Sequence, residues 1–98
     1  ISGSTEDVMS LEPLADKWRA FGWDVVHING HDIPQIVTTF EASRIGSKPL
    51  MVIANTVKGK GISFMEANAK WHHRVPTEEQ YEQAIDEIEH ELALIERG

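Results

Sequence analysis

Cysteine is absent from this chain of 98 residues. Its absence excludes a disulfide framework, a thiol nucleophile and a zinc site built on thiolates. No apolar run approaches the roughly 20 residues that span a bilayer, and no basic, apolar signal peptide opens the sequence. A hydrophobic share of 41% is typical of a globular protein. We therefore expect a soluble, cytoplasmic protein with no membrane partner.

Basic residues are few, and the acidic excess is confined to one segment. The chain has 16 acids and 9 bases, which give a net charge of −7. Residues 78–98 contain a single base, Arg97, and eight acids: Glu78, Glu79, Glu82, Asp86, Glu87, Glu89, Glu91 and Glu96. Residues 1–77 are therefore neutral. Because a neutral body with an acidic tail repels a phosphate backbone, we expect no nucleic-acid partner.

The first predicted helix covers residues 11–21 and follows a polar connection at 1–9. Ser10 is a favourable N-cap for this helix, and Pro13 suits its first turn. Gly22 follows the last apolar residue of the pattern, where a glycine typically ends a helix.

Two β-branched, apolar runs predict buried strands at 24–28 and 50–57. Apolar residues at helical spacing between them predict a helix at 33–45, with Asp32 as its cap. Strand, helix and strand form a β-α-β unit, so we predict an α/β fold with a parallel sheet. Since a stable sheet usually needs three or more strands, we expect the chain to be part of a larger sheet. Its start at Ile1 rather than at a methionine agrees with a processed, truncated or excised segment.

An acidic C-terminal helix is predicted over residues 77–97. Thr77 and Gln80 form a Thr-x-x-Gln capping box. A narrow apolar stripe recurs at steps of four and three: Tyr81, Ile85, Ile88, Leu92 and Ile95. The stripe fits a surface helix that covers the sheet, which we favour, or a helix that docks a partner. Residues 62–76, before this helix, are expected to be irregular with one helical turn near 63–68.

Polar loops follow both predicted strands, at 29–31 and 58–61. In parallel sheets, ligands bind beyond the carboxyl ends of the strands. The second loop, Lys-Gly-Lys-Gly, suits phosphate, because glycine lets the backbone approach a ligand and lysine supplies positive charge. An exposed basic turn would have the same sequence, so both interpretations stay open.

The densest polar and aromatic cluster is Trp-His-His-Arg at 71–74. Histidine titrates near neutral pH and suits proton transfer or phosphate contact. Adjacent side chains point in different directions in an extended segment, so at most one of His72 and His73 enters a given site. Their spacing is also not that of metal ligands on a helix. The alternative is a surface loop in which Trp71 fills the core.

Three segments together resemble one enzyme family. They are TEDVMSLEPLADKWRAFGWDVVHINGHD, KPLMVIANTVKGKGISFMEAN and WHHRVP. In order and spacing they resemble transketolase, closest to the N-terminal subunit of the split, two-chain bacterial and archaeal type. The resemblance covers residues 1–85. It implies a thiamine-diphosphate-binding fold, of which residues 1–98 would be the carboxyl-terminal portion of the diphosphate-binding domain.

The resemblance implies roles for individual residues. His72 falls on the family's active-site histidine, which contacts the cofactor's diphosphate and the donor substrate. Four residues fall on positions that line the cofactor: Ile1, Val57, Gly59 and Gly61. His73 stands where the family usually has glycine, and a positive φ there would strain the loop.

The resemblance also implies thiamine diphosphate and Mg²⁺ as cofactors. The family's metal-binding signature would lie before Ile1, so we expect no metal ligand in this chain. The implied reaction transfers a two-carbon glycolaldehyde unit from a ketose phosphate to an aldose phosphate, in the pentose phosphate pathway. The implied partners are sugar phosphates, the C-terminal subunit, and the remainder of the N-terminal one, in an oligomer such as a dimer. The chain alone is expected to be inactive.

Two alternatives stay open. Another thiamine-diphosphate enzyme, such as deoxyxylulose-phosphate synthase, shares a Gly-His-Asp segment, a glycine-rich loop and a later histidine. The runs LEPLADKWRAFGW and VKGKGISFMEAN favour transketolase. A non-catalytic module would instead use its acidic helix to bind a partner and would not bind thiamine diphosphate.

Overall fold

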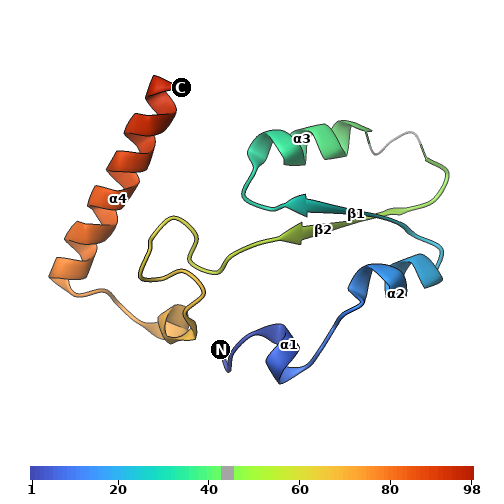
Figure 1. Cartoon of the computed structure of the whole chain (residues 1–98), viewed down its shortest axis with the longest axis horizontal. Coiled ribbons are helices and arrows are strands. Elements are labelled where there is room, and N and C mark those ends of the chain that lie inside the picture. Colours follow the sequence, from blue (N-terminus) through green and yellow to red (C-terminus); the bar gives the residue numbers. More distant parts are fainter. Residues whose placement is uncertain (43–45) are drawn as a thin grey trace. The chain divides into compact units, whose positions relative to one another are not determined.

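The chain folds into helices and one small parallel sheet, shown in Figure 1. The computed structural model describes residues 1–42 and 46–98. They divide into two compact units: one is Gly3–Thr56, and the other is Val57–Gly98 together with Ile1–Ser2. The α/β class predicted from the sequence is confirmed.

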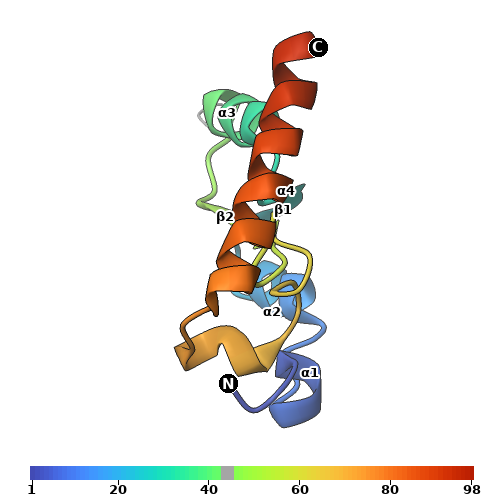
Figure 2. The same ribbon diagram turned by 90° about the vertical axis from the view of Figure 1, so that its left-hand side faces the viewer.

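The Gly3–Thr56 unit contains the predicted β-α-β arrangement. Strands β1 (Asp24–Asn29) and β2 (Leu50–Asn55) pair in parallel along their whole length. Helix α2 (Leu14–Ala20) precedes β1, and helix α3 (Ile33–Ala42) follows it; both helices contact β1. The two helices lie on opposite sides of the sheet (Figures 1 and 2). The last residues of the predicted helix at 33–45 lie outside the described residues, and β2 ends two residues before its predicted limit.

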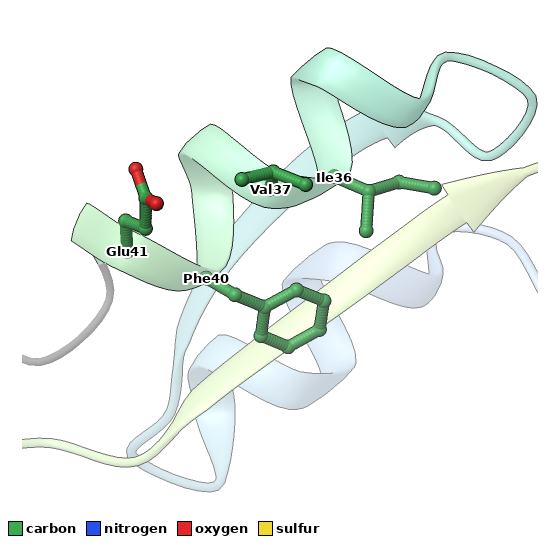
Figure 3. Close-up of a pocket in the computed structure, with 4 residues that line it drawn as sticks. All are labelled: Ile36, Val37, Phe40 and Glu41. Carbon is green, nitrogen blue, oxygen red and sulfur yellow. The ribbon is translucent and has the colours of Figure 1, made fainter.

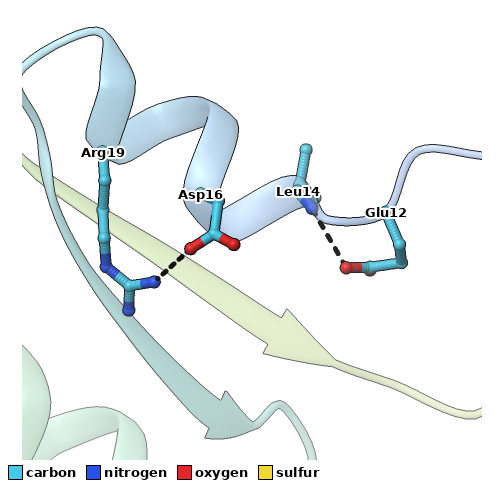
Figure 4. A network of polar contacts seen from close by, with 4 residues as sticks. All are labelled: Glu12, Leu14, Asp16 and Arg19. Carbon is cyan, nitrogen blue, oxygen red and sulfur yellow. Dashed lines mark hydrogen bonds and ion pairs between the residues drawn. The ribbon is translucent and has the colours of Figure 1, made fainter.

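The segment before α2 differs from the prediction. A short helix, α1 (Thr5–Val8), lies within the predicted connection, and α2 begins at Leu14 rather than at residue 11. The predicted Ser10 cap is wrong, because the Ser10 hydroxyl donates to the Glu6 carboxylate instead. The Leu14 N–H donates to the Glu12 side chain at 3.0 Å, as Figure 4 shows.

Aromatic packing joins the end of α2 to the sheet. Gly22 has a φ of +91°, and its N–H donates to the Arg19 carbonyl at 2.9 Å. The predicted helix end is therefore confirmed. The rings of Trp18 and Trp23, on either side of this turn, meet edge to face with centroids 5.0 Å apart. An exposed ion pair of 3.1 Å links Arg19 to Asp16 on the surface of α2 (Figure 4).

The strands are more exposed than the sequence predicts. Within β1, Ile28 is buried, whereas β2 is half-buried from Leu50 to Ile53 and exposed at its last two residues. The reason is physical: in a sheet of two strands, each strand has one hydrogen-bonded neighbour and an open outer edge.

Helix α3 keeps its predicted cap and apolar stripe. The Gln35 N–H donates to the Asp32 carboxylate at 3.1 Å, so Asp32 caps the helix as predicted. The stripe itself is open to solvent: Val37 and Phe40 are exposed. Together with Ile36 and Glu41, they line a shallow depression, whose side chains Figure 3 shows.

The second unit consists of a loop, a short 3₁₀ helix and a long α-helix. Turns cover most of residues 57–68 and include one helix-like hydrogen bond, from the Glu66 N–H to the Ile62 carbonyl at 3.2 Å. The 3₁₀ helix, η2 (Ala69–His73), lies later than the turn predicted near 63–68. It therefore carries His72 and His73, which the sequence placed in irregular structure.

Helix α4 (Glu78–Arg97) begins with the predicted capping box. The Gln80 N–H donates to the Thr77 hydroxyl at 3.2 Å, and the Thr77 N–H donates to the Gln80 side chain at 2.9 Å. Ala84 is buried, whereas the apolar stripe is exposed, from 37% at Ile85 to 67% at Ile95. The favoured interpretation, that this helix covers the sheet, stays a prediction, and so does the alternative that it docks a partner. None of the helices among the described residues is long and apolar enough to cross a membrane.

Candidate functional site

The loop at 57–68 contains two glycines in conformations that other residues rarely adopt. Gly59 has a φ of +76° and Gly61 a φ of +106°. The loop also closes on itself, because the Ala67 N–H donates to the Lys58 carbonyl at 2.8 Å. The glycines thus allow the backbone after β2 to fold into a tight, hydrogen-bonded loop.

The backbone amides at the centre of this loop have partners within it. The Gly61 N–H donates to the Glu66 carboxylate at 3.1 Å. Those of Lys60 and Ile62 donate to loop carbonyls at 3.1 and 3.3 Å. A phosphate that used the Gly61 N–H would therefore have to displace the Glu66 carboxylate. Lys58 and Lys60 are exposed, so their ammonium groups are accessible to an anion.

His72 lies on η2, which the loop supports. The Asn68 side chain caps this helix by accepting the Lys70 N–H at 3.1 Å. Trp71 is half-buried and packs on Phe64, with ring centroids 5.3 Å apart. His72 is exposed. Trp71 is therefore packed, as expected for a surface loop in which this residue fills the core. The neighbouring His72 is accessible, as a histidine in a ligand site must be.

Positive and titratable groups gather at the end of η2. His72, His73, Arg74 and Val75 line an open depression. The Arg74 guanidinium lies 5.1 Å from the centre of the Trp71 ring, within the range of a cation–π contact. A guanidinium beside two imidazoles suits an anionic ligand.

The backbone at His73 is relaxed. Ala67, with a φ of +51°, is the one non-glycine residue with a positive φ in the described part of the chain. His73 lies inside η2 instead. Histidine in place of the glycine that the resemblance implies therefore causes no backbone strain here.

All five residues to which the resemblance gives a role belong to one compact unit: Ile1, Val57, Gly59, Gly61 and His72. The N-terminus lies beside η2 in both views (Figures 1 and 2). Ile1 is 81% exposed and Val57 41%. The structure gathers these residues in one unit, and their contact with a cofactor stays a prediction.

The loop after β1 belongs to the other unit. The Gly30 N–H donates to the Asn55 carbonyl at 2.8 Å, which places this loop at the carboxyl end of β2. The Asn29 side chain accepts the His31 N–H at 2.9 Å and closes the turn.

Comparison with known proteins assigns the family. Residues 1–92 match the family described as "Transketolase, thiamine diphosphate binding domain". The chain belongs to the transketolase family. The resemblance inferred from its three sequence segments is thereby confirmed.

Two bacterial relatives are similar over nearly the whole chain. It is 50% identical over 98 residues to a protein of Phocaeicola vulgatus named as a subunit of apulose-4-phosphate transketolase. It is 48% identical over 94 residues to 6-deoxy-6-sulfo-D-fructose transketolase subunit SqwG of a Clostridium species. These alignments cover 99% and 95% of this chain, but 35% and 34% of the relatives. Human transketolase-like protein 2 is 32% identical over 87 residues, which are 84% of this chain and 14% of that protein.

The donor groups of this transketolase chain fit one part of the cofactor. Lys58, Lys60, His72 and Arg74 are exposed within one unit, and their cationic or hydrogen-bonding groups suit a diphosphate. Among residues 1–42 and 46–98, however, no three His, Asp or Glu side chains converge as metal ligands do. The described residues therefore carry groups that suit the diphosphate, and the position of the Mg²⁺ ligands stays a prediction.

Sequence reasoning missed three side chains that hold this site together. Asn68 precedes η2, and asparagine is a typical cap residue, so a local signal existed. Glu66 and Glu87 reach residues five and 24 positions away, Gly61 and Ser63. Glu87 lies among many similar acids, whereas Glu66 is the one acid between Glu41 and Glu78. In neither case does a local pattern reveal the hydrogen bond that the side chain forms.

Proposed function

We propose that this chain forms the carboxyl-terminal portion of the diphosphate-binding domain of a transketolase. The enzyme would transfer a two-carbon glycolaldehyde unit from a ketose phosphate to an aldose phosphate. One observation carries the proposal: in a member of this family, His72 and the four predicted cofactor-lining residues belong to one compact unit. When bound, thiamine diphosphate supplies the carbanion chemistry. Mg²⁺ would be held by residues outside this chain.

In this proposal, His72 binds the diphosphate and the donor substrate and transfers protons. An imidazole can donate and accept hydrogen bonds, and it changes charge close to neutral pH. His72 is exposed and lines an open depression together with the positively charged Arg74. The loop glycines, Gly59 and Gly61, would let the backbone approach the cofactor closely.

The relatives' names guide the choice of substrate and partner. Apulose 4-phosphate and 6-deoxy-6-sulfofructose are both ketoses with an anionic group. We therefore propose an anionic ketose as the donor substrate. Because both relatives are named as transketolase subunits, we propose that a second subunit completes the active enzyme. We further propose an oligomeric enzyme that acts in the cytoplasm, in the pentose phosphate pathway.

Replacement of His72 in the assembled enzyme tests this function. His72→Ala should lower kcat by about 10²–10⁴-fold, the usual contribution of a general acid–base group. The free energy of unfolding should change little, because the side chain is exposed. His90→Ala, on the exposed surface of α4, is the matched control and should leave kcat unchanged. Steady-state kinetics and urea unfolding provide the two measurements.

The outcome separates the candidate functions. Equal losses of activity and stability in His72→Ala would contradict the catalytic role. If the wild-type assembled protein, tested with its second subunit, binds no thiamine diphosphate in the presence of Mg²⁺, the non-catalytic module is favoured.

A further inference from the structure

We propose that Glu87 of α4 is a positioning residue for the loop at 57–68, and that it keeps this loop ready for thiamine diphosphate. The inference rests on the proposed function, since that function gives Gly59 and Gly61 their contact with the cofactor. It goes further by assigning a role to the acidic helix. The sequence allowed two roles for this helix, covering the sheet or binding a partner.

Glu87 and Ser63 are joined by a group of hydrogen bonds. The Ser63 N–H donates to the two carboxylate oxygens of Glu87, at 3.1 Å to Oε1 and 3.3 Å to Oε2. The Ser63 hydroxyl donates to Oε2 at 3.2 Å. Two donors of one residue thus converge on one carboxylate, and hydrogen bonds to an ionised acceptor are the stronger kind.

Ser63 lies close in sequence to the two loop glycines, and hydrogen bonds connect its neighbours to both sides of the loop. It follows Gly61 by two residues, and the intervening Ile62 donates its N–H to the Gly59 carbonyl at 3.3 Å. On the other side, the Met65 N–H donates to the Ile62 carbonyl at 2.9 Å. An anchor on Ser63 therefore restricts the turns on both of its sides.

Helix α4 provides a firm base for this anchor. It is 20 residues long and begins with a complete capping box. Ala84 lies three residues before Glu87, on the same side of the helix, and is buried. Glu87 itself is half-buried, whereas the control position used below, Glu91, is exposed. Glu87 thus lies on the side of α4 that carries the buried Ala84.

The other acids of the segment 78–98 do not make such a link. In the described part of the chain, Glu87 is the one of these eight acids whose side chain forms a hydrogen bond to a residue outside α4. Its contact with the loop therefore distinguishes Glu87 from the acids that face solvent or interact with the positive N-terminal end of the helix. A loop that is ordered before the ligand arrives binds more tightly, because less conformational entropy is lost on binding.

Cofactor binding by the assembled protein, with Mg²⁺ present, tests the inference. Glu87→Ala should raise the Kd for thiamine diphosphate by about tenfold, equivalent to about 1.4 kcal/mol. Saturating cofactor should restore most of kcat, because His72 is untouched. Glu91→Ala removes the same charge one helical turn later and should leave both constants unchanged. Glu87→Gln retains one carbonyl acceptor and should fall between wild type and Glu87→Ala.

Amide hydrogen exchange in the cofactor-free protein supplies a readout that is independent of activity. The Ser63 amide should exchange faster in Glu87→Ala and at the wild-type rate in Glu91→Ala. Ser63→Ala keeps the amide and removes the hydroxyl, so its effect on Kd should be smaller than that of Glu87→Ala. If Glu87→Ala does not fold, Glu87→Gln and Ser63→Ala carry the test.

Failure of the inference can be told apart from failure of the proposed function. A wild-type protein that does not bind thiamine diphosphate overturns both. A wild-type protein that binds it, with the Kd unchanged in Glu87→Ala, overturns the positioning role alone. Equal increases of Kd in Glu87→Ala and Glu91→Ala would also overturn it, because the effect would then be one of net charge.

Discussion

Gly59 and Met65 approach so closely that a side chain at position 59 would collide with the backbone at 65. A Cβ atom built on Gly59 would clash with the Met65 carbonyl oxygen and lie 2.7 Å from its carbonyl carbon. The φ of Gly59 is also +76°, a region that L-residues avoid. Two independent constraints, the close contact and the positive φ, therefore require glycine at position 59. At Gly61 only the φ of +106° favours glycine, because a Cβ atom added there would have no heavy atom within 4 Å.

Alanine at the two positions should therefore have unequal effects. Gly61→Ala should cost about 1–2 kcal/mol of loop stability, the usual penalty for a left-handed L-residue. Gly59→Ala should cost more, because the backbone must also move away from Met65. Urea unfolding of the protein, with amide exchange across residues 57–68, measures both effects. A larger loss in Gly61→Ala than in Gly59→Ala would contradict the close packing against Met65.

The capping box of α4 gives a second prediction. Thr77→Ala removes the hydroxyl that accepts the Gln80 N–H at 3.2 Å and should destabilise the protein by about 1 kcal/mol. Thr77→Ser retains the hydroxyl and should stay close to wild type. The free energy of unfolding and the helical circular dichroism signal are the measurements. Similar losses in both variants would show that the threonine methyl group matters, rather than the cap.

The features that the sequence predicted correctly are those with a local signal. Gly22, Asp32 and Thr77 each mark a helix end by a property of one or two residues, and all three do so in the structure. Strand β1 and strand β2 follow from β-branched, apolar composition within a few residues. Such signals survive because neighbours in sequence are also neighbours in space.

The features that the sequence did not predict depend on competition between nearby hydrogen-bond partners, or on contacts between residues far apart in the sequence. Ser10 is a favourable cap by itself, but the Glu6 carboxylate takes its hydroxyl, and α2 begins later. The strands were predicted to be buried from composition, yet burial depends on how many neighbours a sheet has. For the site, the motif resemblance gives His72 and the glycines roles that stay predictions. The hydrogen bonds of the Glu66 and Glu87 carboxylates to the loop became visible only in three dimensions.

A third prediction concerns the acid titration of Glu6, whose carboxylate organises the connection between α1 and α2. Hydrogen bonds from the Ser10 hydroxyl and the Leu11 N–H, the latter at 3.0 Å, hold the pKa of Glu6 below its ordinary value. A bond from the Glu12 N–H at 3.2 Å and the charge of Lys17 act in the same direction. A depressed pKa means that the folded chain favours the ionised carboxylate.

The sign of the pH effect follows from that depression. Glu6 stabilises the folded state fully above its ordinary pKa of about 4.3, and this stabilisation is lost as the pH falls through the lower, folded-state pKa. Ser10→Ala removes the largest cause, so it should raise the pKa of Glu6 toward the ordinary value. Loss of amide protection at Leu11 on acidification should then begin at a higher pH than in wild type. Carbon-13 titration of the Glu6 carboxyl measures the pKa directly, with Ser4→Ala, which removes a different side-chain bond at α1, as the control. An unchanged or lower Glu6 pKa in Ser10→Ala would show that the backbone amides, and not the hydroxyl, set the titration.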